Sequence, residues 1–182
     1  FDAVVLAVAP YHVDALLPED TPDYIQTAYQ SLSYHAITTV YLRYAQAVKL
    51  PAPLTGFSDG TAQWVLHRGA LGLPDNEVAV IISVSDCAEA WKDKDLAEKI
   101  HADIKRVCPD LDNPEAVRII TEKRATTAAT VDFVQPDFSW LHHRRIYPVG
   151  DYLHPRYPAT LEAAVQSGFA AAEKLMLDLR VE

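Results

Sequence analysis

The feature that most constrains the fold is a regular alternation between residues 36 and 44. Threonine, aliphatic and aromatic residues at the even positions are separated by Thr39, Tyr41 and Arg43. A period of two predicts a β-strand with one apolar face. A fold for this chain therefore needs a sheet that turns one face to a core.

Further strands are predicted at five places, over residues 3–8, 62–68, 78–84, 117–126 and 145–149. The segments at 3–8 and 78–84 are continuously apolar, which is typical of strands buried on both faces. Helices are predicted over residues 10–17, 24–32 and 93–107, and from residue 160 towards the C-terminus. Residues 132–140 predict an irregular link that contains proline.

The final predicted helix places apolar residues on one side, namely Leu161, Val165, Phe169, Ala172, Met176 and Leu179. Strands and helices mix along the chain without a strict alternation. We therefore expect an α+β or α/β fold, built on a mixed, largely antiparallel sheet with flanking helices.

Charge and length exclude several classes of protein. The chain has 182 residues and a net charge of -9, with its basic residues scattered. Nucleic-acid binding relies on a basic patch, so we expect no such partner. No apolar run reaches the about 20 residues that span a bilayer, and no signal peptide is evident. The two cysteines, Cys87 and Cys108, predict reduced thiols and a cytoplasmic location.

The start of the chain suggests a piece of a longer protein. The sequence opens at Phe1 rather than Met and enters the apolar segment 3–8 without a lead-in. We expect a fragment that forms one domain or two small lobes.

The strongest candidate for chemistry lies between Arg145 and Gly168. A strand ends in the pair Gly150-Asp151, and after a short loop a helix opens with Thr160-Leu161-Glu162-Ala163-Ala164. Glycine lets a ligand approach the backbone closely, and an aspartate can accept a hydrogen bond from a ribityl or ribose hydroxyl. The helix start offers free N–H groups and a positive dipole end. On these residues alone, a turn followed by an ordinary core-facing helix remains the alternative.

Several short segments, in order along the chain, resemble one family of enzymes. They are Asp2 to Pro10, Thr38 to Leu42, Ala62-Gln63-Trp64, Glu122 to Thr126, Val149-Gly150-Asp151, Thr160-Leu161-Glu162 and Ser167-Gly168. Together they are similar to the flavin-containing amine oxidase and phytoene desaturase superfamily. The branch that they resemble most is that of the squalene-associated FAD-dependent desaturases, or hydroxysqualene dehydroxylases.

The resemblance implies an FAD-dependent oxidoreductase that acts on a long apolar polyprenoid such as hydroxysqualene. Gly150 and Asp151 would contact the ribityl-pyrophosphate part of FAD, and residues 160–164 would face the pyrimidine edge of the flavin ring. A substrate-binding lobe would span about 33–140, between flavin-domain pieces at about 1–32 and 141–182. Tyr41 and Trp64 would line the substrate pocket, although packing of the sheet is the alternative for both. An apolar substrate would also imply peripheral contact with a membrane.

Two departures from the family pattern matter. Ala163 stands where the family usually has glycine, and the chain has no Gly-x-Gly-x-x-Gly turn for the pyrophosphate. We therefore expect the N-terminal FAD-binding half to be missing, and this chain alone to be inactive and to bind FAD weakly or not at all.

The sequence leaves two alternatives to this function open and argues against a third feature, a metal site. A flavin-containing amine oxidase is the alternative within the superfamily. A non-catalytic association domain, which dimerises through an uncovered apolar face, is the alternative from another class. His142, His143 and His154 suggest a metal site, but adjacent histidines point to different sides of an extended chain, so we expect no metal. The catalytic residues stay unassigned.

Overall fold

The computed structural model describes residues 1–85, 93–130, 137–153 and 156–180. The chain divides into two compact units. Unit 1 comprises Phe1–Ser33 and Thr127–Glu182, and unit 2 comprises Tyr34–Thr126. Residues 127–140, which the family resemblance assigned to the substrate-binding lobe, therefore belong to unit 1.

Unit 2 is a five-stranded sheet with the strand order β3-β4-β5-β2-β6. Its strands are β2 (Tyr34–Arg43), β3 (Leu54–Gly56), β4 (Trp64–His67), β5 (Glu77–Ser83) and β6 (Ala116–Thr127). The β3–β4, β4–β5 and β5–β2 pairs are antiparallel. A 3-10 turn, η2 (Arg68–Leu71), follows β4. The prediction of a largely antiparallel sheet is confirmed.

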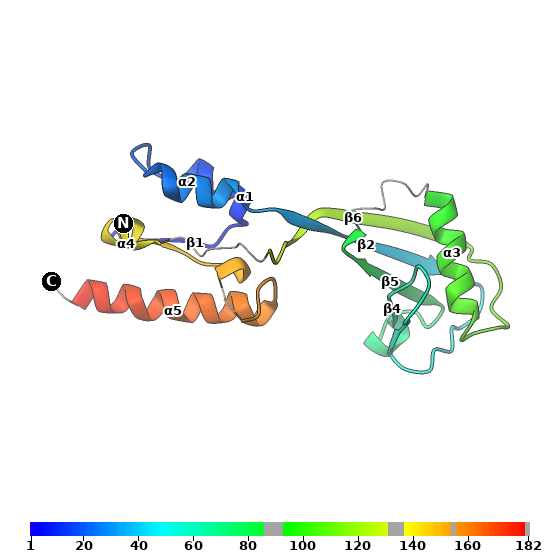
Figure 1. Ribbon diagram of the computed structural model, residues 1–182. Coiled ribbons are helices and arrows are strands. Elements are labelled where there is room, and N and C mark those ends of the chain that lie inside the picture. Colours follow the sequence, from blue (N-terminus) through cyan, green and yellow to red (C-terminus); the bar gives the residue numbers. More distant parts are fainter. Residues whose placement is uncertain (86–92, 131–136, 154–155, 181–182) are drawn as a thin grey trace. The chain divides into compact units, whose positions relative to one another are not determined.

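One face of this sheet packs against helix α3 (Asp93–Lys105), which Figure 1 shows in green beside the strands. Val40 and Leu42 of β2 share a core with Leu96 and Ile100 of α3, and all four are buried. Each such side chain contributes about 1.5–3 kcal/mol when it leaves water. The alternation in the sequence therefore correctly identified the face of β2 that turns to the core.

A half-buried carboxylate also holds α3 to the loop before β4. Asp103 accepts hydrogen bonds from the backbone N–H groups of Thr61 at 2.6 Å and Ala62 at 2.8 Å. Gly60 is required beside it, because its φ is +100° and a Cβ there would lie 2.4 Å from the Asp103 carboxylate.

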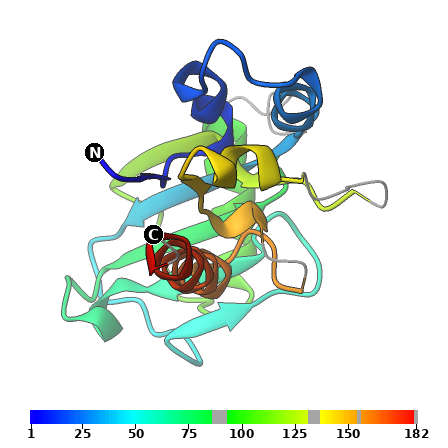
Figure 2. The ribbon, with the colours of Figure 1, turned by 90° about the vertical axis from the view of Figure 1, so that its left-hand side faces the viewer.

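Unit 1 contains a two-stranded parallel sheet of β1 (Val4–Leu6) and β7 (Ile146–Pro148). Its helices are α1 (Pro10–Val13), α2 (Asp23–Gln30), α4 (Ser139–His143) and α5 (Leu161–Arg180), with 3-10 turns η1 (Asp14–Leu16) and η4 (Asp151–Leu153). Figures 1 and 2 show α5 on one side of the strands and α1 and α2 on the other. A core that includes Leu6, Ile25 and Tyr152 joins the helices on the α1–α2 side to the strands and to η4.

The structure differs from the sequence prediction at two elements. The short strand β3 falls where turns were expected, because its partner β4 supplies the hydrogen bonds that three residues cannot specify alone. Helix α4 lies partly in the expected irregular link. There the Asp137 carboxylate accepts from the N–H of Ser139 at 2.9 Å, and Leu141 is buried in the core of unit 1.

Two apolar segments of unit 1 face solvent in the part of the chain that the structure describes. Val4 and Val5 of β1 are 45% and 48% exposed, so the expected burial of this strand on both faces is wrong for this structure. Its described neighbours are too few to cover it. On α5, the apolar residues predicted to share one side are all exposed, and Phe169 retains 69% of its surface. We call Leu161, Val165, Phe169, Ala172, Met176 and Leu179 the α5 stripe.

Candidate functional site

The end of β7 is tied directly to α5. The N–H of Gly150 donates to Oγ of Ser167 at 2.9 Å, and this hydroxyl in turn donates to the carbonyl of Ala164 at 2.9 Å. At the far end of the helix, the Tyr147 hydroxyl donates to the Asp178 carboxylate at 2.8 Å. Burial and this carboxylate raise the pKa of Tyr147 to about 12, so the phenol remains a donor. These contacts fix the start of α5 beside Gly150.

Glycine at position 150 is required by packing. A Cβ there would lie 2.4 Å from Cε1 of Tyr152, whose ring is buried and whose hydroxyl lies 3.3 Å from that of Tyr29. The sequence analysis assigned this glycine to the close approach of a ligand. In the structure the Tyr152 ring takes the space of a Cβ, and Ser167 takes the N–H.

Asp151 opens η4 and is half-buried. Its carbonyl accepts a hydrogen bond from the N–H of Ala159 at 3.1 Å, which joins η4 to the residues before α5. Ala159 has a φ of 58°, a left-handed conformation that is uncommon for alanine. Within the described residues, the Asp151 carboxylate has neither a hydrogen bond nor an ion pair, so it can accept from a ligand hydroxyl.

Thr160 is the N-cap of α5. Its hydroxyl accepts from the N–H of Ala163 at 3.1 Å and donates to the carbonyl of Tyr157 at 2.7 Å. This cap leaves the N–H groups of Leu161 and Glu162 without an acceptor in the described part of the chain. A helix of 20 residues adds the positive end of its dipole at this point.

Each residue of the helix start has a distinct place. The side chain of Leu161 is 90% exposed, whereas that of Ala163 is fully buried and faces the protein. Ala163 therefore does not line the open surface, and the departure from glycine there concerns internal packing. Ala164 is half-buried. The structure thus brings Gly150, Asp151 and residues 160–164 together at one end of α5.

This end of α5 suits the electron-rich edge of a flavin. Two backbone donors and a helix N-terminus favour negative charge, and the free carboxylate of Asp151 suits a ribityl hydroxyl. Of the predicted contacts, the Gly150 N–H is already used by Ser167. FAD bound here would supply hydride transfer, and the chain would supply orientation and charge stabilisation.

Tyr41 and Trp64 lie in unit 2, on the face of the sheet opposite to α3. Tyr41 of β2 lies opposite Ala79 of β5, and Ala79 lies opposite Leu66 of β4. Trp64 of β4 lies opposite Ile81 of β5. Alternation therefore places all five side chains on one face. Trp64 is 47% exposed, and its ring packs on Gly56 of the neighbouring strand. We call this face the open face of the sheet; its middle is largely apolar.

The histidines that suggested a metal site, and the two cysteines, have the following places in the structure. The His142 ring stacks on Tyr147 with centroids 5.3 Å apart, and Nδ1 of His143 lies 2.6 Å from the carbonyl of Ser139. No group of metal-ligand side chains occurs among the described residues, and His154 lies outside them, as does Cys87. Cys108 is a free thiol whose pKa is raised by burial.

Comparison with known proteins identifies the family. The sequence profile described as flavin containing amine oxidoreductase matches residues 1–176. The chain belongs to this family. As a member of the flavin containing amine oxidoreductases, it is similar to a hydroxysqualene dehydroxylase of Rhodopseudomonas palustris, with 33% identity over 96% of the chain. It is also similar to a hydroxysqualene dehydroxylase of Zymomonas mobilis, with 27% identity over 94% of the chain.

The chain spans 38% of the length of each of these two relatives. Solved structures show the same fold at low sequence identity. A putative protoporphyrinogen oxidase from Exiguobacterium matches with a TM-score of 0.65 and 18% identity, over 98% of this chain and 41% of that one. A reduced UDP-galactopyranose mutase matches with a TM-score of 0.68 and 11% identity, over 100% of this chain and 42% of that one. Among the helices that the structure describes, none has the length and apolarity needed to cross a membrane.

Proposed function

We propose that this chain is the C-terminal portion of an FAD-dependent oxidoreductase and supplies one part of its flavin site. The contacts are the carboxylate of Asp151 and the N–H groups of Leu161 and Glu162, with Gly150 and Thr160 holding the helix start in place. The observation that carries the proposal is the helix start itself, where two donors and one carboxylate lack partners within the described residues. The first N–H groups of a helix have no acceptor within the helix, and donors kept open at a dipole end favour an electron-rich ligand.

The proposed substrate is a long apolar polyprenoid such as hydroxysqualene. The two hydroxysqualene dehydroxylases are similar to this chain over nearly its whole length. The open face of the sheet supports the same substrate class, since Trp64 and Leu66 present apolar surface with few charges between them. Pockets for apolar molecules are lined in this way, with aromatic and aliphatic side chains. Tyr41 and Trp64 would contact the substrate.

The rest of the flavin domain would cover unit 1. The α5 stripe and the exposed β1 residues Val4 and Val5 are apolar surfaces of a kind that a folded protein normally buries. A continuously apolar parallel strand is typical of a sheet with helices on both faces. We infer that a further segment of the same protein supplies those layers and the glycine turn for the pyrophosphate. This chain alone would then be inactive and bind FAD weakly.

The α5 stripe also supports a second candidate, a surface for self-association. Gel filtration of the 182-residue chain over a hundredfold range of concentration distinguishes a surface that another segment of the protein covers from a surface for self-association. A concentration-dependent dimer favours association, and a strict monomer counts against it.

Turnover of the longer protein that contains this chain tests the proposed function. With the flavin reduced beforehand, hydroxysqualene should reoxidise it: the carbon–oxygen bond breaks, a hydride enters at that carbon, and the hydroxyl takes up a proton and leaves as water. In a parallel sample, a primary amine is added to oxidised flavin. Bleaching by the amine would favour the amine oxidase alternative, and no reaction in either sample would reject both.

A further inference from the structure

A groove with a surplus of positive charge lies at one end of the open face. Its volume is about 560 Å³, and it is lined by Tyr41, Leu42, Arg43, Arg68, Glu77, Ala116, Val117, Arg118 and Ile120. Three guanidinium groups thus face one carboxylate, in a chain whose net charge is -9. The groove is thus positive although the chain as a whole is negative. Positive groups gathered in this way repel one another unless an anion lies between them.

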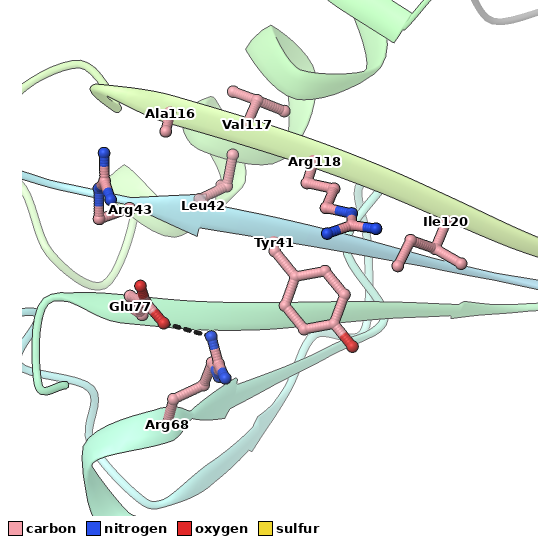
Figure 3. A pocket seen from close by; sticks show the side chains of 9 residues that line it. All are labelled: Tyr41, Leu42, Arg43, Arg68, Glu77, Ala116, Val117, Arg118 and Ile120. Carbon is pink, nitrogen blue, oxygen red and sulfur yellow. Dashed lines mark hydrogen bonds and ion pairs between the residues drawn. The ribbon is translucent and has the colours of Figure 1, made fainter. Parts of the chain in front are cut away.

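Arg68 is held in place by two contacts. It forms an ion pair with Glu77, and its guanidinium lies 5.5 Å from the centre of the Tyr41 ring. Figure 3 shows this ion pair on one side of Tyr41. The carboxylate of Glu77 therefore compensates Arg68. Arg43 lies directly across from Glu77 in the β2–β5 register and, with Arg118, leaves the groove with a surplus of positive charge.

Arg43 and Arg118 are exposed, and neither has an acidic partner in the part of the chain that the structure describes. They lie on adjacent strands, because β6 is the edge neighbour of β2 and the N–H of Glu115 donates to the carbonyl of Arg43 at 2.8 Å. In Figure 3 the Arg118 side chain reaches from β6 towards Tyr41, opposite Arg68. Two unpaired guanidinium groups thus border one hollow.

Apolar side chains form the rest of the wall. Ile120 of β6 alternates with Arg118, lies on the same face of the strand (Figure 3) and is 45% exposed, and Ala116 also lines the groove. A ligand that satisfies the whole groove needs an anionic group and an apolar part. Guanidinium groups bind phosphates and carboxylates in a bidentate way, and a phosphate has enough oxygens to accept from two guanidinium groups at once.

We propose that this groove binds the phosphate group of an amphipathic organic phosphate, with Arg43 and Arg118 as its ligands and Arg68 as a fixed neighbour. Such a phosphate has two sources, the headgroup of an anionic phospholipid at a membrane surface or a free phosphorylated molecule. The proposal concerns unit 2 alone and does not depend on a flavin.

Binding to the 182-residue chain tests the proposal in two arms. Inorganic pyrophosphate is titrated calorimetrically, and vesicles of phosphatidylglycerol are compared with vesicles of phosphatidylcholine by co-sedimentation. The double variant Arg43→Gln with Arg118→Gln removes the two ligands. The double variant Lys99→Gln with Lys105→Gln is the matched control, because it removes the same charge from exposed positions on α3, across the sheet.

The arginine variant should bind about tenfold or more weakly than wild type, since each lost charge-assisted hydrogen bond weakens binding. The lysine variant should bind as wild type does. Loss in the pyrophosphate arm indicates a free phosphate, and loss in the vesicle arm alone indicates a headgroup. If wild type binds neither probe, or both variants lose affinity equally, the proposal is wrong. In wild type, a bound probe should slow hydrogen exchange of the backbone amides of residues 116–120 relative to the chain without the probe. This measurement does not depend on whether the variants fold.

Discussion

Substitution of Gly150 by alanine probes the junction on which the candidate flavin site rests. A Cβ at this position would lie 2.4 Å from Cε1 and 2.7 Å from Cδ1 of Tyr152. Such an approach is well inside van der Waals contact, and the Tyr152 ring is buried beside Tyr29 and cannot move freely. Overpacking of this kind costs about 1–3 kcal/mol. Movement of the backbone to relieve it would also break the hydrogen bond from Gly150 to Ser167.

Gly168 provides the matched control, because it lies within α5 and a Cβ there meets nothing within 4 Å. Alanine is favoured over glycine in a helix by about 0.5–1 kcal/mol, so this second variant should gain stability. Thermal unfolding followed by circular dichroism measures both, at about 2–4 °C per kcal/mol for a chain of this size. Hydrogen exchange of residues 146–153 locates the change in unit 1. The packing argument fails if Gly150→Ala unfolds at the wild-type temperature, or if Gly168→Ala is destabilised as much.

Three further predictions concern local stability. Thr160→Ala should lose about 1 kcal/mol of unfolding free energy, because it removes the N-cap, while Thr160→Ser keeps it; urea unfolding compares them. Asp103→Ala should cost about 1.5–3 kcal/mol of unfolding free energy by the same measurement, because two backbone N–H groups lose a charged acceptor. The control is Asp59, which forms an exposed ion pair with Arg106, and Asp59→Ala should cost under about 1 kcal/mol. Burial lowers the pKa of His101 below its usual 6.5. The unfolded chain therefore binds more protons, and unfolding free energy should fall as pH drops below about 6.5, with a smaller slope in His101→Gln; equal slopes would contradict this.

Local patterns were enough to predict most of the fold. The period of two across β2 and the row of Leu96, Ile100 and Ile104 on α3 are both direct consequences of burying one face. The strand β3 and the helix α4 were missed, because three to five residues carry no period. Their structure depends on a partner strand in one case and on a buried Leu141 in the other.

The candidate site was predictable in its residues more than in their roles. Sequence resemblance located Gly150, Asp151 and the start of α5, and the structure brings them together. The sequence could not reveal that Gly150 packs under Tyr152 or that Ala163 is buried, because both depend on side chains that meet only after folding. Arg43, Arg68 and Arg118 gave no signal, since they are far apart in the sequence. Only the assembly of β4, β5, β2 and β6 into one sheet gathers them, with Arg68 in the turn that follows β4.

The FAD affinity of the longer protein that contains this chain tests the central claim most directly. Equilibrium dialysis would compare wild type with Asp151→Ala, and with Asp112→Ala as a control for an exposed carboxylate in unit 2. If Asp151 and the start of α5 hold the flavin, Asp151→Ala should weaken FAD binding about tenfold or more, and Asp112→Ala should not change it. Wild-type affinity in Asp151→Ala, or a protein that binds no FAD at all, would contradict the account.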